Sequence, residues 1–354
     1  MCIRDSSQWE RREHHQDAVT ELLKSGAAYQ DEGAVRFRVP DEGEITFTDA
    51  VLGEITNPYS AIADFVIQRS DGSPLYNLAV AVDDRDMGIT HVVRGQDHVS
   101  NTPRQLMLLR ALGADPPVYA HIPLLHGPDG KKLSKRHGAA SVQAVRDEGY
   151  LPEAVRNYIA LLGWGYDEST TFMTTAELVE RFALERVSKN PAVFDEQKLR
   201  WMNGRYIREL SLEDLTDRLS VFYDRDIPRE VVEISQEKIQ TLADFWPLAG
   251  ALIDPPGEPD DKAWEKWGPS ADWQRLLAVL TAVDPFDVEH LEQALGGLVD
   301  ELGVKPKDVY QPIRVALTGK TVSPGIFESL WALGREESLS RVEKALQRAE
   351  SERV

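Results

Sequence analysis

The feature that most constrains the fold of this chain is a change in hydrophobic period near Ser141. Before it, residues 35–39 and 45–48 alternate between apolar and polar side chains, which is typical of half-buried strands. Other segments of this region have apolar residues at helical spacing. After it, strand signals almost vanish, and apolar residues recur at helical spacing, as over residues 288–302. The sequence therefore predicts an α/β region followed by an all-α region.

Turn and cap signals divide the first region into elements. Residues 12–23 predict a helix that ends at Gly26, and the turn residues 40–43 predict a hairpin between strands at 35–39 and 45–48. The further expected elements are a strand at 64–69, a buried strand or helix at 75–82, short strands at 89–94 and 117–125, and a helix from Asn101 to Gly113. Because polar loops follow the strands, we expect ligands at the C-terminal edge of an α/β sheet.

Composition limits the classes of function. The net charge is −19, and residues 141–354 carry −14 of it, which argues against non-specific binding to nucleic acid. No run of about 18 apolar residues and no secretory signal occurs, so we expect a cytoplasmic protein that does not contact a membrane. With Cys2 as the single cysteine and no helical histidine pair, no zinc site is expected, and any metal would be Mg²⁺ brought by a substrate.

A local cluster of cations stands out in this acidic chain. Lys131, Lys132, Lys135 and Arg136 fall within six residues of a loop that glycines frame at both ends. One interpretation is a solvated turn. The other is a loop that closes on phosphates.

The amino-acid sequence of this loop favours the second interpretation. The string Lys132-Leu-Ser-Lys135 resembles the KMSKS signature of class I aminoacyl-tRNA synthetases, and residues 130–138 resemble its glutamyl-tRNA synthetase form. The resemblance implies that Lys132, Ser134 and Lys135 are catalytic. It also implies that Lys132, Lys135 and Arg136 bind the phosphates of ATP.

A second block resembles the substrate-binding segment of the same family. It comprises residues 75–84, 87–98 and 101–105. The resemblance implies that Tyr76 and Arg94 bind the amino-acid substrate and that Asp97 and His98 lie beside adenosine. A core or interface tyrosine is an equally open interpretation of Tyr76, and we interpret Asp83, Asp84 and His121 as structural.

The resemblance continues into the helical region. Residues 149–164 and 194–203 resemble the family's stem-contact region, and residues 310–319 resemble the end of its anticodon-binding part. Helical periodicity here indicates the bacterial-type glutamyl enzyme, since the glutaminyl relative carries β-barrels. Arg314 matches a position close to the anticodon, although an arginine that caps a helix end is an equal alternative.

The family's other signature, HIGH, has no counterpart in these residues. We therefore expect an N-terminally incomplete chain that is inactive alone. Its expected parts are a partial Rossmann-like catalytic domain with a remnant of the acceptor-stem insertion at 1–140, a stem-contact region at 141–190, and a helical anticodon-binding domain at 191–354.

The function implied is that of a glutamate–tRNA ligase, which uses ATP with Mg²⁺ to attach L-glutamate to tRNA(Glu) through a glutamyl-adenylate. A monomer is expected. The alternatives are a non-catalytic tRNA-binding paralogue and an unrelated phosphate-binding α/β enzyme.

Overall fold

The structure is a computed structural model that describes residues 7–133, 141–256 and 261–352. The chain divides into two compact units, Met1–His137 with Ile159–Phe194, and Gly138–Tyr158 with Asp195–Val354. The stem-contact segment expected at 141–190 is therefore shared between the two units. Its functional delimitation stays a prediction.

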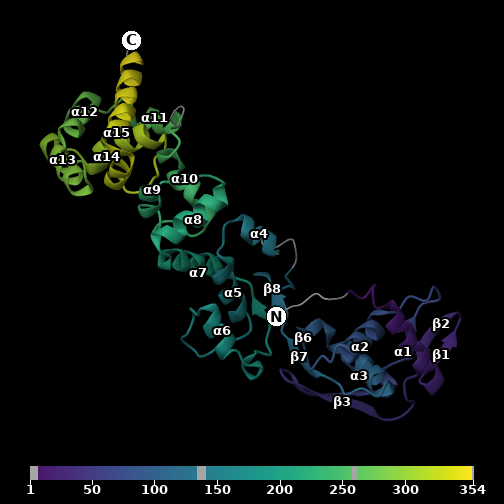
Figure 1. Cartoon of the computed structure of the whole chain (residues 1–354). Coiled ribbons are helices and arrows are strands. Elements are labelled where there is room, and N and C mark those ends of the chain that lie inside the picture. Colours follow the sequence, from purple (N-terminus) through teal and green to yellow (C-terminus); the bar gives the residue numbers. More distant parts are fainter. Residues whose placement is uncertain (1–6, 134–140, 257–260, 353–354) are drawn as a thin grey trace. The chain divides into compact units, whose positions relative to one another are not determined.

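The first unit combines parallel and antiparallel sheets with helices (Figure 1). Its helices are α1 (Arg12–Ser25), α2 (Tyr76–Asp86), α3 (Thr102–Ala111) and α6 (Thr175–Arg181), with short 3-10 helices η1 (Tyr59–Ala61), η2 (Gln96–Asn101) and η4 (Leu184–Arg186). Its strands are β1 (Ala28–Asp31), β2 (Ala34–Phe37), β3 (Glu44–Asp49), β4 (Gly53–Pro58), β5 (Phe65–Gln68), β6 (His91–Gly95), β7 (Val118–Ile122), β8 (Leu125–His126) and β9 (Ala192–Val193). Figure 1 shows α2 and α3 side by side.

The sheet that matters for function has the strand order β4-β3-β7-β6. Strands β3, β7 and β6 are parallel, and β4 is added antiparallel to β3 at the edge. Along β3 the side chains of Ile45, Phe47 and Asp49 are buried while their neighbours are exposed, as the alternating sequence predicts. This register places the carboxylate of Asp49 on the buried face.

The hairpin expected between residues 35–39 and 45–48 is wrong. Strand β2 pairs with β1 and β5 in an antiparallel sheet of order β1-β2-β5, whereas β3 pairs with β4. Strands β1 and β2 are joined by Glu32 and Gly33, whose φ values of 47° and 83° are both positive, and two-residue turns of this kind match the twist of paired strands. Residues 40–43 therefore connect two sheets. The alternative left open at 75–82 is resolved as helix α2.

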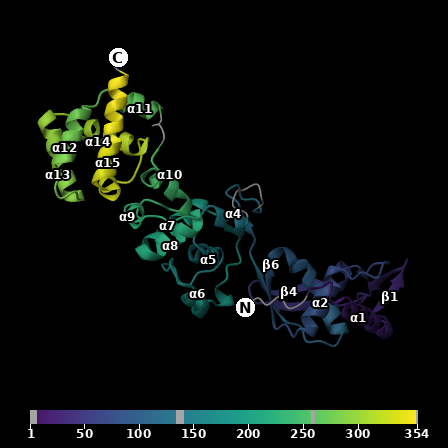
Figure 2. The same cartoon turned by 45° about the horizontal axis from the view of Figure 1, so that its top comes forward.

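The second unit is helical (Figure 2). Its elements are α4 (Val142–Asp147), α5 (Pro152–Leu161, whose last residues belong to the first unit), α7 (Glu196–Glu209), α8 (Leu212–Tyr223), α9 (Arg229–Glu233), η5 (Leu242–Asp244), α10 (Phe245–Ala249), η6 (Gly250–Leu252), α11 (Asp261–Trp267), α12 (Trp273–Ala282), α13 (Val288–Leu302), α14 (Pro306–Thr318) and α15 (Ile326–Ser351). Helices α12 and α14 pack along the long α15 (Figure 2), which is kinked at Gly334, where φ is 75°. Among the described residues, no helix has both the length and the apolar character to cross a membrane.

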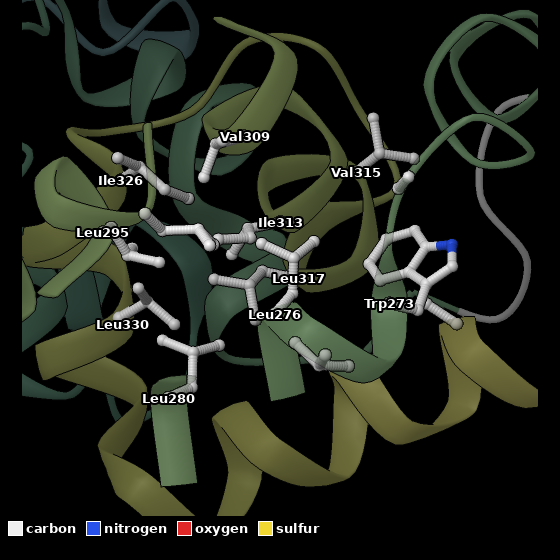
Figure 3. Close-up of a cluster of buried hydrophobic side chains, with 14 of the residues drawn as sticks. Trp273, Leu276, Leu280, Leu295, Val309, Ile313, Val315, Leu317, Ile326 and Leu330 are labelled. Atoms are coloured by element: carbon white, nitrogen blue, oxygen red, sulfur yellow. The ribbon is translucent and has the colours of Figure 1, made fainter. Parts of the chain in front are cut away.

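The core of this unit explains why the periodicity predicts it well. Leu291, Leu295 and Leu298 of the expected stripe are buried. Figure 3 shows Leu295 in one cluster with branched side chains of α12, α14 and α15. A second buried cluster, around Leu151, Leu215 and Phe245, joins α5 to α8, α9 and α10. Most of the buried residues in both cores come from helices whose apolar side chains recur at helical spacing.

Candidate active site

The candidate site lies where the parallel strands β6 and β7 end. In their register Arg94 is opposite His121, and the chain continues from β6 through η2 into α3. Arg94 therefore comes from a strand end, Asp97 and His98 from the turn after it, and Tyr76 from the start of α2. This is the edge at which α/β sheets bind ligands, as expected from the sequence.

The guanidinium of Arg94 is held by three neutral groups. Its Nε donates to His121 Nε2 at 3.1 Å, and its Nη2 donates to Thr102 Oγ1 at 2.8 Å and to the carbonyl of His98 at 3.4 Å. It also lies 5.3 Å from the ring centre of Tyr119. No salt bridge to Arg94 occurs within the part of the chain that the structure describes. An arginine so fixed presents a positive charge that its own unit leaves without a carboxylate partner.

Two groups near Arg94 have shifted proton affinities. Burial raises the pKa of Asp84 to about 6, although the charge of Arg94 opposes the rise. Burial also raises the pKa of Tyr119 to about 12, and its buried hydroxyl has no hydrogen-bond partner among the described residues. Asp84 is therefore mostly ionised at pH 7 and takes up a proton near pH 6, so it balances the charge of Arg94 less on the acid side.

The remaining predicted residues of this unit form a polar rim. Tyr76 is 47% exposed, and its hydroxyl is 3.4 Å from His98 Nδ1. The Nζ of Lys132 is 2.8 Å from Asp97 Oδ2, and this side-chain hydrogen bond lowers the pKa of Asp97. The structure thus brings one lysine of the cation loop to the residue that follows β6.

Pairing with strand β8 fixes the position of the Lys132 backbone. The backbone N–H of Leu133 donates to Leu125 at 2.7 Å, and His126 forms an antiparallel bridge with Lys132. The other predicted loop residues, Ser134, Lys135 and Arg136, lie outside the described residues. No cluster of three or more His, Cys, Asp or Glu side chains suited to a metal ion occurs within the described ranges.

Sequence reasoning missed one residue that the structure places behind the site. Asp49 ends β3, and its Oδ2 lies 2.5 Å from His121 Nδ1, the ring whose other nitrogen faces Arg94. A polar residue directly after the alternating segment 45–48 was the available signal. The sequence could not show that β3 lies beside β7, because these strands are about 70 residues apart.

Basic residues of the helical unit have different environments. Arg200 pairs with Asp244 at 2.6 Å, and Arg205 pairs with Glu209 at 3.0 Å, so their charges are balanced within their own unit. Burial lowers the pKa of Arg314, with Glu328 opposing, and the Nε of Arg314 donates to Ser323 Oγ at 3.1 Å. Its position in α14 favours neither of the two interpretations of Arg314, an anticodon contact or a cap at a helix end.

Comparison with protein families matches both parts of the chain. Residues 3–201 match the family described as tRNA synthetases class I (E and Q), catalytic domain. Residues 197–346 match the anticodon binding domain family.

Individual relatives give the same result. The glutamate–tRNA ligase of Syntrophobacter fumaroxidans is 44% identical over 88% of this chain and 69% of its own length, and glutamate–tRNA ligase 1 of Caldanaerobacter subterraneus subsp. tengcongensis is 38% identical over 93% and 71%. Among solved structures, a glutamate tRNA ligase from Elizabethkingia meningosepticum superposes with a TM-score of 0.82 over 98% of this chain and 84% of that protein. At 24% identity this last likeness shows the fold.

Proposed function

Because the chain belongs to the glutamate–tRNA ligase family of class I aminoacyl-tRNA synthetases, we propose that it serves the ATP-dependent attachment of glutamate to tRNA(Glu). The Rossmann-like α/β domain would bind glutamate and ATP, and the helical domain would bind the anticodon. In the reaction, the α-carboxylate of glutamate attacks the α-phosphate of ATP, and pyrophosphate leaves. The terminal ribose hydroxyl of the tRNA then attacks the adenylate.

The observation that carries this proposal is the guanidinium of Arg94 at the edge of the parallel sheet, which among the described residues is hydrogen-bonded to neutral groups only. A guanidinium binds a carboxylate through two parallel hydrogen bonds. The amide of glutamine would turn an N–H₂ group toward these donors, so the site favours glutamate. Tyr76, half exposed on the same rim, would bound the substrate on one side.

Lys132 is the described residue best placed to meet the phosphates. Its ammonium is 61% exposed and is held by Asp97, which follows the strand end that carries Arg94. We propose that Lys132 exchanges this partner for a phosphate oxygen when ATP binds, and that Lys135, Ser134 and Arg136 act with it. Their contribution is electrostatic, and one preorganised donor of this kind accounts for about 10²–10³ in rate.

We propose that the tRNA stem is contacted within 141–190, a segment that both units share, and that the anticodon is contacted by α14 and its neighbours in the second unit. Arg314 is the candidate contact. Single-stranded loops are read through stacking and base edges, which need few cations and suit an acidic protein.

The residues present supply only one side of this phosphate site. Because no His-Ile-Gly-His string occurs among the 354 residues, we propose that this polypeptide does not form the adenylate by itself. The same observation favours a second candidate, a tRNA-binding paralogue without catalysis. Glutamate-dependent exchange of pyrophosphate into ATP is the test, and robust exchange by this polypeptide would refute both statements.

The role of Arg94 has its own test. Calorimetric titration of the 354-residue chain with L-glutamate should show binding that Arg94→Ala abolishes. Arg110→Ala is the matched control, because Arg110 lies in the last turn of α3, is exposed, and is outside the residues that resemble the substrate-binding segment. Equal glutamate affinity of the Arg94 variant and the unaltered chain would remove Arg94 from the site.

A further inference from the structure

The side chain behind Arg94 is a fully buried histidine paired with a buried aspartate. His121 is 0% exposed and Asp49 is 1% exposed. One ring nitrogen of His121, Nδ1, is 2.5 Å from Asp49 Oδ2, and the other, Nε2, is 3.1 Å from the Nε of Arg94. The three residues come from the neighbouring strands β3, β7 and β6.

The chemistry of the two partners fixes where the proton of His121 lies. The Nε of Arg94 can only donate, so Nε2 of His121 must accept and carries no proton. A carboxylate can only accept, so Nδ1 must carry the proton and donate it to Asp49. His121 is thus a neutral ring in the Nδ1–H form.

Backbone geometry keeps Asp49 ionised. Burial on its own would raise the pKa of this carboxyl, but hydrogen bonds from the N–H groups of Leu52, Val51 and His121 and from the His121 ring together lower it. The Oδ1 atom accepts the N–H groups of Val51 and Leu52 at 2.9 Å each and that of His121 at 3.2 Å. Oδ2 is left for the ring, so the aspartate enforces the ring's orientation.

We propose that Asp49 and His121 are positioning residues that fix the guanidinium of Arg94 in the orientation that selects a substrate carboxylate. This inference rests on the proposed role of Arg94 in binding glutamate. Neither residue touches the substrate in this scheme. Thr102 Oγ1 accepts from Nη2 and lies 3.3 Å from His121 Nε2, so neighbouring neutral acceptors align the guanidinium without neutralising it.

The arrangement has a pH limit. A proton on Nε2 would remove the acceptor and put a second cation against Arg94. The charged and titratable groups that face His121 are Asp49, Arg94, His98 and Tyr119, whose ring is stacked on that of His121. Burial, opposed by Asp49, lowers the pKa of His121. Asp84 and Tyr119 face Arg94 from α2 and β7. Glutamate affinity should therefore hold at neutral pH and fall on the acid side.

Two substitutions separate the two nitrogens. His121→Gln keeps an oxygen near Nε2 that still accepts from Arg94, whereas His121→Asn keeps a polar group near Nδ1 only. Glutamate affinity of the full chain should fall at least about 10-fold in His121→Asn and within about 3-fold in His121→Gln, the range expected for losing one hydrogen bond to a charged group. His290→Asn is the matched control, since His290 pairs with Asp287 at 2.7 Å but is partly exposed and has no arginine partner among the described residues. Equal losses in both His121 variants would overturn the proposal.

Nitrogen NMR gives a readout that does not depend on glutamate. In the full chain labelled with ¹⁵N-histidine, His121 should show a protonated Nδ1 and a bare Nε2. In ¹⁵N-arginine-labelled chain, the Arg94 Nε–H should exchange slowly with solvent, and quickly in His121→Asn. A protonated Nε2 at neutral pH, or slow exchange in His121→Asn, would overturn the positioning role. The predicted ring form with an Arg94 signal that glutamate does not shift would instead reject Arg94 as the glutamate ligand, and the specificity role with it.

Discussion

Two adjacent aspartates on α2 should respond to the same substitution with opposite signs. The carboxylate of Asp83 accepts the Nε of Arg11 at 2.7 Å and lies 2.8 Å from the Nε2 of the buried His15. The carboxylate of Asp84 makes no such bond among the described residues, and burial raises its pKa to about 6. We expect Asp83→Asn to destabilise the first unit and Asp84→Asn to stabilise it at alkaline pH.

The magnitude for Asp84 follows from linkage. A carboxyl whose pKa is higher in the folded than in the unfolded chain binds its proton more tightly when folded, so the free energy of unfolding falls as the pH rises through that interval. The rise from 3.8 to about 6 corresponds to a cost of about 3 kcal/mol above pH 6, at about 1.4 kcal/mol per pKa unit. Partial solvation of Asp84 makes this an upper limit, and we expect about 1–3 kcal/mol. Below pH 4 the cost disappears, since both states are protonated.

Hydrogen exchange in increasing urea, read by mass spectrometry, measures this locally. Peptides from α2 should show a higher urea midpoint for Asp84→Asn than for the unaltered chain at pH 8, and the same midpoint at pH 4. Asp83→Asn should lower the midpoint at pH 8 by the equivalent of about 2–4 kcal/mol, because it removes a partly buried ion pair. Peptides from α14 in the other unit serve as the internal reference. An Asp84→Asn gain of equal size at both pH values would refute the electrostatic reasoning.

Three further predictions concern the rest of the chain. Gly149→Ala should lower the melting temperature of the helical unit, because φ at Gly149 is +77° and an added Cβ would lie 2.7 Å from the backbone nitrogen of Ala243; an unchanged melting curve would contradict the geometry. Asp97→Asn should leave the free energy of unfolding, measured in urea, within about 1 kcal/mol of the unaltered value, since its pair with Lys132 is exposed. It should alter ATP affinity in an equilibrium titration. A large loss of stability without a change in ATP affinity would show that the pair is structural. Arg314→Ala should weaken binding of a tRNA(Glu) anticodon stem-loop to the full chain in a filter assay. The affinity of the unaltered chain for this loop should fall only modestly with salt. Equal binding of a loop with an altered anticodon would refute the anticodon role.

Local signals predicted local structure well. The helix that ends at Gly26 and the leucine stripe of α13 are both confirmed, because each depends on residues within a few turns of one another. Pairing between strands was predicted less well from the sequence. Residues 40–43 have turn chemistry, but nothing local reveals that they connect two sheets rather than two strands.

The candidate site shows the same division. Arg94 and Asp97 were named from the family resemblance, and their roles stay predictions; their placement at and just after the end of a short strand agrees with the apolar segment before them. The partnership of Asp49 with His121 could not, because the parallel pairing of β3 with β7 brings it about. The long-range partners of a site depend on sheet order, which periodicity does not encode.

The division of the chain into units has a consequence for how the protein is made and cut. Residues 159–194 return to the first unit after 138–158 have entered the second, so the chain passes between the two units three times. During synthesis, the first unit lacks its last strand, β9, until residue 193 has left the ribosome, and β8 stays without its partner until then. A chain ended at residue 140 would therefore leave that strand edge open, whereas one ended at residue 194 would retain every residue of the first unit.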